Sequence, residues 1–314
     1  MAFLRAFGSW LPPRRVTNRE LAPLVDATPE WILEVSGIEE RRYAAETDTV
    51  AGIGILAAQD CLEKAGATAA ELGMILVASG SSDRFCPGPA SQVAAGLGLA
   101  STPAFDIPVS SAGSLIGLAL AAQLAPAAGR VLVVGAEIMS RRIALTPEGK
   151  NTAILFGDGA GAALVDAETG FARIADSCLY TDGASAEVLF VGDHRFYMDG
   201  SAVILHASRK MPRAINELLA RNRLAASQVE AFLLHQANLN LISRVAAALK
   251  TPPERFFTNI ARYGNTSSAS LLIATDEWNC SRSGALAGPL VFSAFGSGLN
   301  WGALLAVPPE SLLP

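Results

Sequence analysis

The sequence predicts a layered α/β protein built from two duplicated βα halves. With 314 residues, the chain is long for one ordinary domain and suits two fused halves. Its strand-like runs are almost continuously apolar, as is typical of sheets covered on both faces. Hydrophobic residues make up 51% of the chain, enough for a large core. We therefore expect an α/β/α/β/α sandwich, with residues 1–170 as the first half and residues 171–314 as the second.

The same order of elements occurs twice along the chain. Each half has a helix, a strand, a junction marked by Gly or Ser, a buried helix and a further strand. In the first half the leading helix and the two strands cover residues 57–66, 74–79 and 131–134. In the second half they cover residues 214–222, 231–235 and 289–292. The boundary is expected near residues 166–175, after a strand at 162–165.

Two capping signals occur near the N-terminus. Thr17 and Glu20 have the spacing of a capping box. Thr28 followed by Pro29 combines an N-cap with proline at the first helical position, which places Trp31 on the first turn of a short helix. From the residues alone, Trp31 could be a core anchor or a stacking platform at the surface.

Composition argues against several classes of protein. A net charge of −5 disfavours general binding to nucleic acid, which needs a basic surface. The longest apolar stretch, residues 115–128, is shorter than the roughly 20 residues that span a bilayer, so we expect a buried helix there. The first residues carry no secretory signal, and a cytoplasmic protein is expected. The four cysteines lack metal-ligand spacing, so we expect reduced thiols and no metal site.

Ser111 lies where an apolar strand ends and a helix over residues 114–124 begins. At a helix N-terminus, unpaired backbone N–H groups and the positive dipole end favour a developing anion. Acyl-transfer nucleophiles are commonly placed in this way. His235 follows a strand of the second half, and Asn265 precedes an apolar helix near Leu271. The site is therefore expected between the two halves.

Five motifs in this order resemble the ketoacyl-ACP synthase III family of the thiolase superfamily, along nearly the whole chain. They are Thr28–Trp31, Phe156–Ala162, His235–Asn238, Gly264–Ser267 and Phe295–Gly298. The resemblance implies a thiolase-like fold and an acyltransferase that uses acyl-CoA as substrate and no cofactor. It also implies a homodimer and acyl carrier protein as a partner.

The resemblance further implies a role for each site residue. In the family, a cysteine at the position of Ser111 accepts the acyl group. Residues matching His235 and Asn265 then hold a malonyl thioester while it loses carbon dioxide and attacks. The oxyanion hole would be formed by the backbone N–H groups of Ser111 and Ser297.

Binding residues are implied in the same way. Those for coenzyme A are Trp31, Lys150 and Asn238. Those for the acyl pocket are Phe85, Cys86, Phe156 and Phe295, with Cys86 reaching across the dimer interface and leaving room for longer chains. Three positions that are usually basic in the family hold Val35, Leu205 and Asn240, which puts ordinary carrier recognition in doubt. Basic residues that could meet an acidic partner, or form a solvated helix face, are Arg209, Lys210, Arg213, Arg221 and Arg223.

Serine in place of cysteine changes the first chemical step. A thiol with a pKa near 8.5 can be ionised by a helix terminus, whereas a dipole effect of up to about 2 kcal/mol is too small to ionise a hydroxyl. Ser111 therefore needs a base, and His235 is the candidate because His194 and His206 carry no motif.

Three interpretations follow from the sequence. The leading one is an acyltransferase or condensing enzyme that uses Ser111, with starter-unit selection in polyketide or fatty-acid-like biosynthesis as a candidate role. The second is a noncatalytic partner subunit of an active homologue. The third is a Cys-to-Ser trapped variant of an ordinary synthase.

Overall fold

A ten-stranded mixed sheet forms the centre of the computed structural model, which describes residues 1–192 and 195–311. Its first five strands are β1 (Phe3–Trp10), β4 (Met74–Ala78), β5 (Ala104–Ile107), β6 (Arg130–Ile138) and β7 (Asp158–Asp166). The other five are β8 (Ala172–Thr181), β11 (Ala231–Leu234), β12 (Phe256–Phe257), β13 (Leu290–Gly296) and β14 (Asn300–Val307).

The two sets of strands repeat one topology. The order is β1-β7-β6-β4-β5 in the first set and β8-β14-β13-β11-β12 in the second. In each set the first two pairings are antiparallel and the last two are parallel. A short antiparallel ladder between β1 and β8 joins the sets. β7 ends at Asp166 and β8 begins at Ala172, and the division of the chain after residue 170 stays a proposal.

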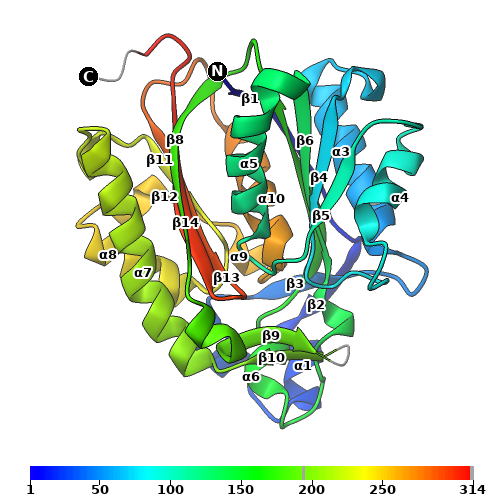
Figure 1. Cartoon of the computed structure of the whole chain (residues 1–314). Helices are drawn as coiled ribbons and strands as arrows, with labels where there is room; N and C mark the ends of the chain where they lie inside the picture. The colour runs from blue at the N-terminus through cyan, green and yellow to red at the C-terminus, as the bar shows by residue number, and fades with distance from the viewer. Residues whose placement is uncertain (193–194, 312–314) are drawn as a thin grey trace.

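Helices complete the five expected layers (Figure 1). Helices α5 (Gly113–Ala128) and α10 (Ser270–Ser281) lie in the middle and pack against strands of both sets. On the outside, α3 (Val50–Ala65) and α4 (Pro89–Gly96) cover the first set, and α7 (Gly200–Arg221) covers the second with α8 (Leu239–Ala248) packed beside it. The thiolase-like α/β architecture is thereby confirmed.

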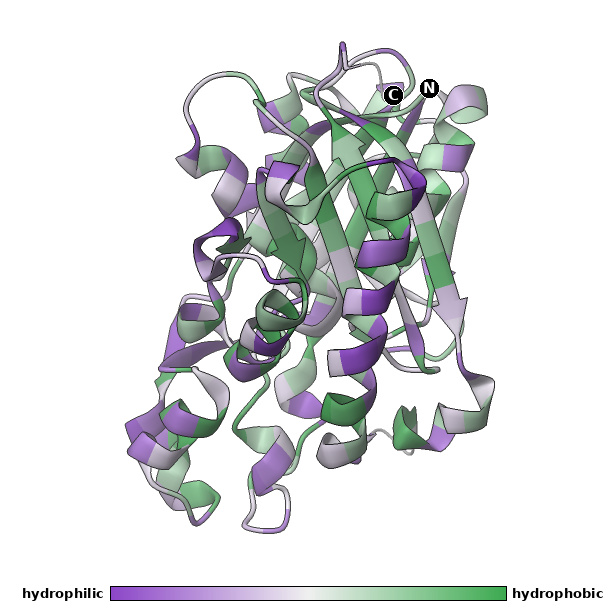
Figure 2. Ribbon diagram, turned by 90° about the vertical axis from the view of Figure 1, so that its left-hand side faces the viewer, coloured by the Kyte–Doolittle hydropathy of each residue, from purple (hydrophilic) through white to green (hydrophobic). Residues whose placement is uncertain are grey.

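The core follows from this layering. Strands β4, β6 and β7 are buried at almost every position, because helices cover both faces of the sheet. Figure 2 shows the apolar colour concentrated in the strands and the polar colour on the outer helices. The apolar stretch at residues 115–128 forms the central helix α5. Among the described residues, no helix combines the length and hydropathy needed to cross a membrane.

Smaller elements gather at one end of the sandwich. These are β2 (Arg14–Thr17), α1 (Asn18–Leu21), α2 (Pro29–Ser36), β3 (Glu40–Tyr43), α6 (Lys150–Ala153), β9 (Leu189–Gly192), β10 (Arg195–Met198) and α9 (Ile260–Tyr263). Both capping predictions are confirmed here: Thr17 and Glu20 form a capping box, and Thr28 caps α2 by accepting the N–H of Trp31. The cavity described below opens beside α2 and α6.

Candidate active site

Ser111 occupies a strained turn between β5 and α5. Its φ is 66°, in the left-handed region that residues other than glycine seldom adopt. The Ser111 N–H donates to Ser267 Oγ at 3.0 Å, and the Ser110 N–H donates to Ser297 Oγ at 3.0 Å. Two hydroxyl groups from the second half of the chain, those of Ser267 and Ser297, therefore hold the Ser110–Ser111 turn of the first half in place. Ser111 lines a cavity, and its hydroxyl has no hydrogen-bond partner among the described residues.

His235 follows β11 and is 4% exposed. Its Nδ1 lies 2.5 Å from Ser270 Oγ, which also accepts the N–H of Gln236 at 3.1 Å. Because a hydroxyl can donate or accept, Ser270 is compatible with either neutral tautomer of the ring. Burial lowers the pKa of His235 to about 3. The ring is therefore neutral at ordinary pH and can serve as a hydrogen-bond donor or as a proton acceptor.

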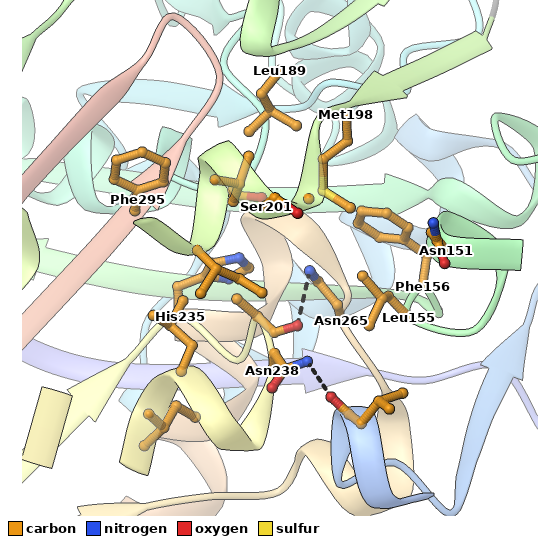
Figure 3. A pocket seen from close by; sticks show the side chains of 18 of the residues that line it. Asn151, Leu155, Phe156, Leu189, Met198, Ser201, His235, Asn238, Asn265 and Phe295 are labelled. Carbon is orange, nitrogen blue, oxygen red and sulfur yellow. Dashed lines mark hydrogen bonds between the residues drawn. The ribbon is translucent and has the colours of Figure 1, made fainter. Parts of the chain in front are cut away.

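Asn265 is fixed through both its backbone and its side chain. Its N–H donates to Leu155 O at 2.8 Å, and its carbonyl accepts the Gly157 N–H at 3.1 Å. Its Nδ2 donates weakly to Ala237 O at 3.4 Å (Figure 3). Asn265 and His235 both line the cavity described below.

A cavity of about 480 Å³ brings most of the predicted site residues together. Those that line it are Trp31, Ser111, Phe156, His235, Asn238, Asn265 and Phe295. Figure 3 shows the His235, Asn265 and Asn238 side chains in the lower and central part of the view, with Leu189 and Met198 above them and Phe156 to the right. The rest of the wall is mainly apolar and comes from β9, β10, α7 and α8. Such a lining suits a long, largely apolar substrate with one polar reacting end.

The expected coenzyme A residues lie at or near this cavity. Lys150 does not line it, but its Nζ stands 5.4 Å from the centre of the Trp31 ring. An adenine that stacked on this face of Trp31 would have to displace Lys150. Asn238 Nδ2 donates to Val35 O at 2.9 Å, and Asn240 Nδ2 also donates to that carbonyl at 3.1 Å. Asn240 thereby links the start of α8 to α2.

Two predicted acyl-pocket residues do not lie in the cavity of a single subunit. Phe85 is fully exposed, and Cys86 is also exposed, on the loop between β4 and α4. Neither residue lines the cavity of its own subunit. Because Cys86 was expected to reach the pocket of a second copy, the acyl-pocket assignment of both residues stays a prediction.

The expected oxyanion donors already have protein partners. The Ser111 N–H donates to Ser267 Oγ, and the Ser297 N–H donates to Ser110 O at 3.2 Å. Ser297 does not line the cavity. An oxyanion hole at these two groups stays a prediction that requires one or both bonds to be shared or exchanged.

Two basic residues on α7 form ion pairs with carboxylates of the same chain. Lys210 pairs with Asp182 at 2.6 Å, and Arg221 pairs with Asp176 at 2.7 Å. Arg209, Arg213 and Arg223 are exposed. Of the other two histidines, His206 lies on α7 and does not line the cavity, and His194 lies outside the described residues.

Sequence reasoning did not identify the residues that support the three reacting groups. Ser267, Ser270 and Glu137 belong to common residue types, and only the packing of the halves brings them together. Helix α8 offered a signal, because Leu241, Ile242 and Val245 recur at helical spacing and line the cavity. No group of three metal-ligating side chains occurs within residues 1–192 and 195–311.

The fold and site define a thiolase-like condensing acyltransferase. Two sequence models agree: 3-Oxoacyl-[acyl-carrier-protein (ACP)] synthase III matches residues 105–183, and its C-terminal counterpart matches residues 219–307. The chain is 37% identical to the Beta-ketoacyl-[acyl-carrier-protein] synthase III of Oleidesulfovibrio alaskensis, over 97% of this chain and 98% of that protein. It is 38% identical to the protein of the same name from Rhodobacter capsulatus, with the same coverage. The chain therefore belongs to the 3-oxoacyl-ACP synthase III family.

Solved structures agree with this assignment. The crystal structure of 3-oxoacyl-[acyl-carrier-protein] synthase III from Aquifex aeolicus VF5 superposes with a TM-score of 0.93 at 32% identity, covering 98% of this chain and all of that one. The priming β-ketosynthase of the R1128 polyketide biosynthetic pathway gives a TM-score of 0.87 at 30% identity, covering all of this chain and 97% of that one. Both support the thiolase-like fold expected from the sequence.

Proposed function

We propose that this chain is an acyl-CoA-dependent condensing acyltransferase in which Ser111 is the nucleophile. The observation that supports this most is the single cavity lined by Ser111, His235 and Asn265 together with Trp31. A pantetheine arm could enter beside Trp31 and present its thioester to the Ser111 hydroxyl. The apolar wall would exclude water from the ester that forms.

In the first step, Ser111 Oγ attacks the thioester carbonyl. The C–S bond breaks, an oxygen ester forms, and the serine proton passes through His235 to the departing coenzyme A thiolate. The tautomer with a proton on Nδ1, donated to Ser270 Oγ, leaves the Nε2 lone pair free for this transfer. A His235 pKa of about 3 makes the ring a weak base, so we expect acylation to be slow.

In the second step, His235 and Asn265 act as donors. The opposite tautomer places a proton on Nε2, and Asn265 contributes its Nδ2–H. Both can bond the thioester oxygen of a malonyl group as its bond to the carboxylate breaks, which releases carbon dioxide and leaves an enolate. The enolate carbon attacks the Ser111 ester, the ester C–O bond breaks, and the departing Ser111 Oγ takes up a proton that His235 relays from solvent. Because an oxygen ester is less activated than a thioester, this transfer is harder than in an enzyme with cysteine.

Acyl carrier protein is the proposed source of the malonyl group. The relatives with which this chain shares its family carry that partner in their names. Arg209 and Arg213 are exposed on α7, whose first turns line the cavity, and could receive an acidic partner. Selection of a polyketide starter unit is the finer role that we propose, supported by the similarity to the R1128 priming ketosynthase.

We also propose a homodimer in the cytoplasm. Strand β5 is the edge of the ten-stranded sheet, and its Phe105 is 55% exposed, beside a loop with fully exposed Phe85. Open backbone groups at a sheet edge favour pairing with a second copy. Such pairing would bring Phe85 and Cys86 against the partner's cavity.

Turnover with a carrier protein tests the proposed function. The chain is incubated with an acyl-CoA and malonyl-loaded carrier protein, and the carrier-bound product is identified by mass spectrometry. A β-ketoacyl product with the wild-type chain, and none with Ser111→Ala, is the expected result. Product formed equally by Ser111→Ala would show that Ser111 is not the nucleophile. Absence of product and of any acyl adduct with a broad acyl-CoA panel would favour a noncatalytic partner subunit.

A further inference from the structure

Glu137 is a buried carboxylate that the proposed chemistry does not use. It is completely buried near the end of β6, and among the described residues it forms no ion pair with a cation. Its oxygens instead accept bonds from the Ser79 hydroxyl at 3.3 Å, the Gly80 N–H at 3.1 Å and the Ser81 hydroxyl at 2.5 Å. Burying a charge without a cation is unfavourable unless several hydrogen bonds compensate. This arrangement therefore calls for an explanation.

The carboxylate connects directly to the second half of the chain. Ser267 Oγ donates to Glu137 Oε1 at 2.8 Å, and the Ser268 N–H donates to the same oxygen at 3.2 Å. A serine hydroxyl has one proton. Because Ser267 gives its proton to Glu137, only lone pairs remain for its other contacts. One of these accepts the Ser111 N–H at 3.0 Å.

The direction of these bonds depends on the charge of Glu137. An ionised carboxylate can only accept, so it fixes Ser267 Oγ as a donor toward Glu137 and an acceptor toward Ser111. An amide at position 137 could instead donate to Ser267 and allow its hydroxyl to turn toward the Ser111 N–H. The two protons would then face one another, and the bond that restrains Ser111 would be lost.

Ser111 needs such a restraint because of its backbone conformation. A non-glycine residue at φ 66° persists only where the surrounding structure holds it. Relaxation to negative φ would turn the hydroxyl away from its place on the cavity wall. We propose that Glu137, acting through Ser267, holds Ser111 in the conformation that accepts the acyl group. This inference rests on the proposed role of Ser111 as nucleophile. Glu137 contacts no reacting atom and is a positioning residue.

A double-mutant cycle tests the proposal in the full-length chain. Glu137→Gln, Ser267→Ala and the double variant are compared with wild type by the rate of acyl adduct formation over a range of acyl-CoA concentrations. Each single variant should lower the limiting rate about tenfold or more, since small displacements of a reacting group have effects of this size. The half-saturating concentration should stay unchanged. If Glu137 acts through Ser267, the double variant should be no slower than Ser267→Ala.

The matched control is Thr275→Ala. It removes another fully buried hydroxyl bond of the second half, from Thr275 Oγ to Leu271 O at 2.7 Å, with no link to Ser111. This variant should acylate at the wild-type rate. The proposal is overturned if the rate reductions caused by Glu137→Gln and Ser267→Ala multiply in the double variant, or if neither substitution changes the limiting rate. It is also overturned if Thr275→Ala slows acylation as much as these two substitutions do. Should Glu137→Gln not fold, Glu137→Asp, which keeps the charge but shortens the side chain that reaches Ser267, replaces it in the cycle with the same criteria.

A second readout separates this inference from the proposed function. In a Ser111→Cys background, the pH dependence of alkylation by iodoacetamide reports the pKa of the new thiol without any acyl-CoA. If Glu137→Gln and Ser267→Ala each let the turn relax away from the helix start, both should move the alkylation midpoint to higher pH. An unchanged midpoint would overturn the positioning role. If wild-type chain accepts no acyl group at all, the proposed function fails, and this shift still decides the inference.

Discussion

Acidification should destabilise the folded chain through His235. Burial lowers the pKa of this ring from 6.5 to about 3, so the folded state excludes a proton that the unfolded state binds. The stability contributed by the neutral ring is fully present above pH 6.5 and is lost as the pH falls toward 3. At pH 4.5, two pH units below 6.5, the loss amounts to about 2.7 kcal/mol, at roughly 1.4 kcal/mol per unit.

Urea unfolding at pH 7.5 and pH 4.5 measures this effect. Carboxylates also titrate in this range, so the wild-type chain is compared with His235→Asn, whose amide can still bond Ser270. The free energy of unfolding of the wild type should fall by about 2.7 kcal/mol more than that of the variant. Equal losses in the two proteins would show that His235 is not held neutral, and the account of its tautomers would fail with it.

Three further predictions concern the site and the interface. His235→Ala should slow acylation by roughly 10²–10⁴-fold, at least as much as Asn265→Ala, because a hydroxyl needs a base; near wild-type adduct formation in His235→Ala would show another route of activation. Lys150→Ala should weaken coenzyme A binding in calorimetry more than Lys150→Arg does, and equal affinities would remove Lys150 from the nucleotide site. Cys86→Phe should disfavour longer acyl-CoAs by more than tenfold, at about 0.8 kcal/mol per excluded methylene. A monomer in light scattering, or an unchanged chain-length profile, would contradict the proposed shared pocket.

The sequence predicted those parts of the fold that depend on local pattern. Continuous apolar segments predicted β4, β6, β11 and β13, because strands covered on both faces do not need to alternate apolar and polar residues. Helix α7 was expected to begin near residue 214 but begins at Gly200. Pro212 favours a helix break, yet the tertiary packing of α7 on β13 and β14 keeps it helical there.

The sequence likewise predicted some residues of the candidate site and not others. Ser111, His235 and Asn265 were found from their motifs, and the structure places all three on one cavity. Their supporting partners, Ser267 and Ser270, could not be predicted, since each bonds a residue at least 35 positions away in the chain. Such contacts arise only when the two halves pack together.

Locating the acyl group on the chain tests the central claim most directly. After incubation with a panel of acyl-CoAs, intact mass should increase by one acyl group, and peptide mapping should place that increase on Ser111. Ser111→Ala should show no increase. An adduct on another residue, or one that persists in Ser111→Ala, would contradict the assignment of Ser111 as the acyl acceptor.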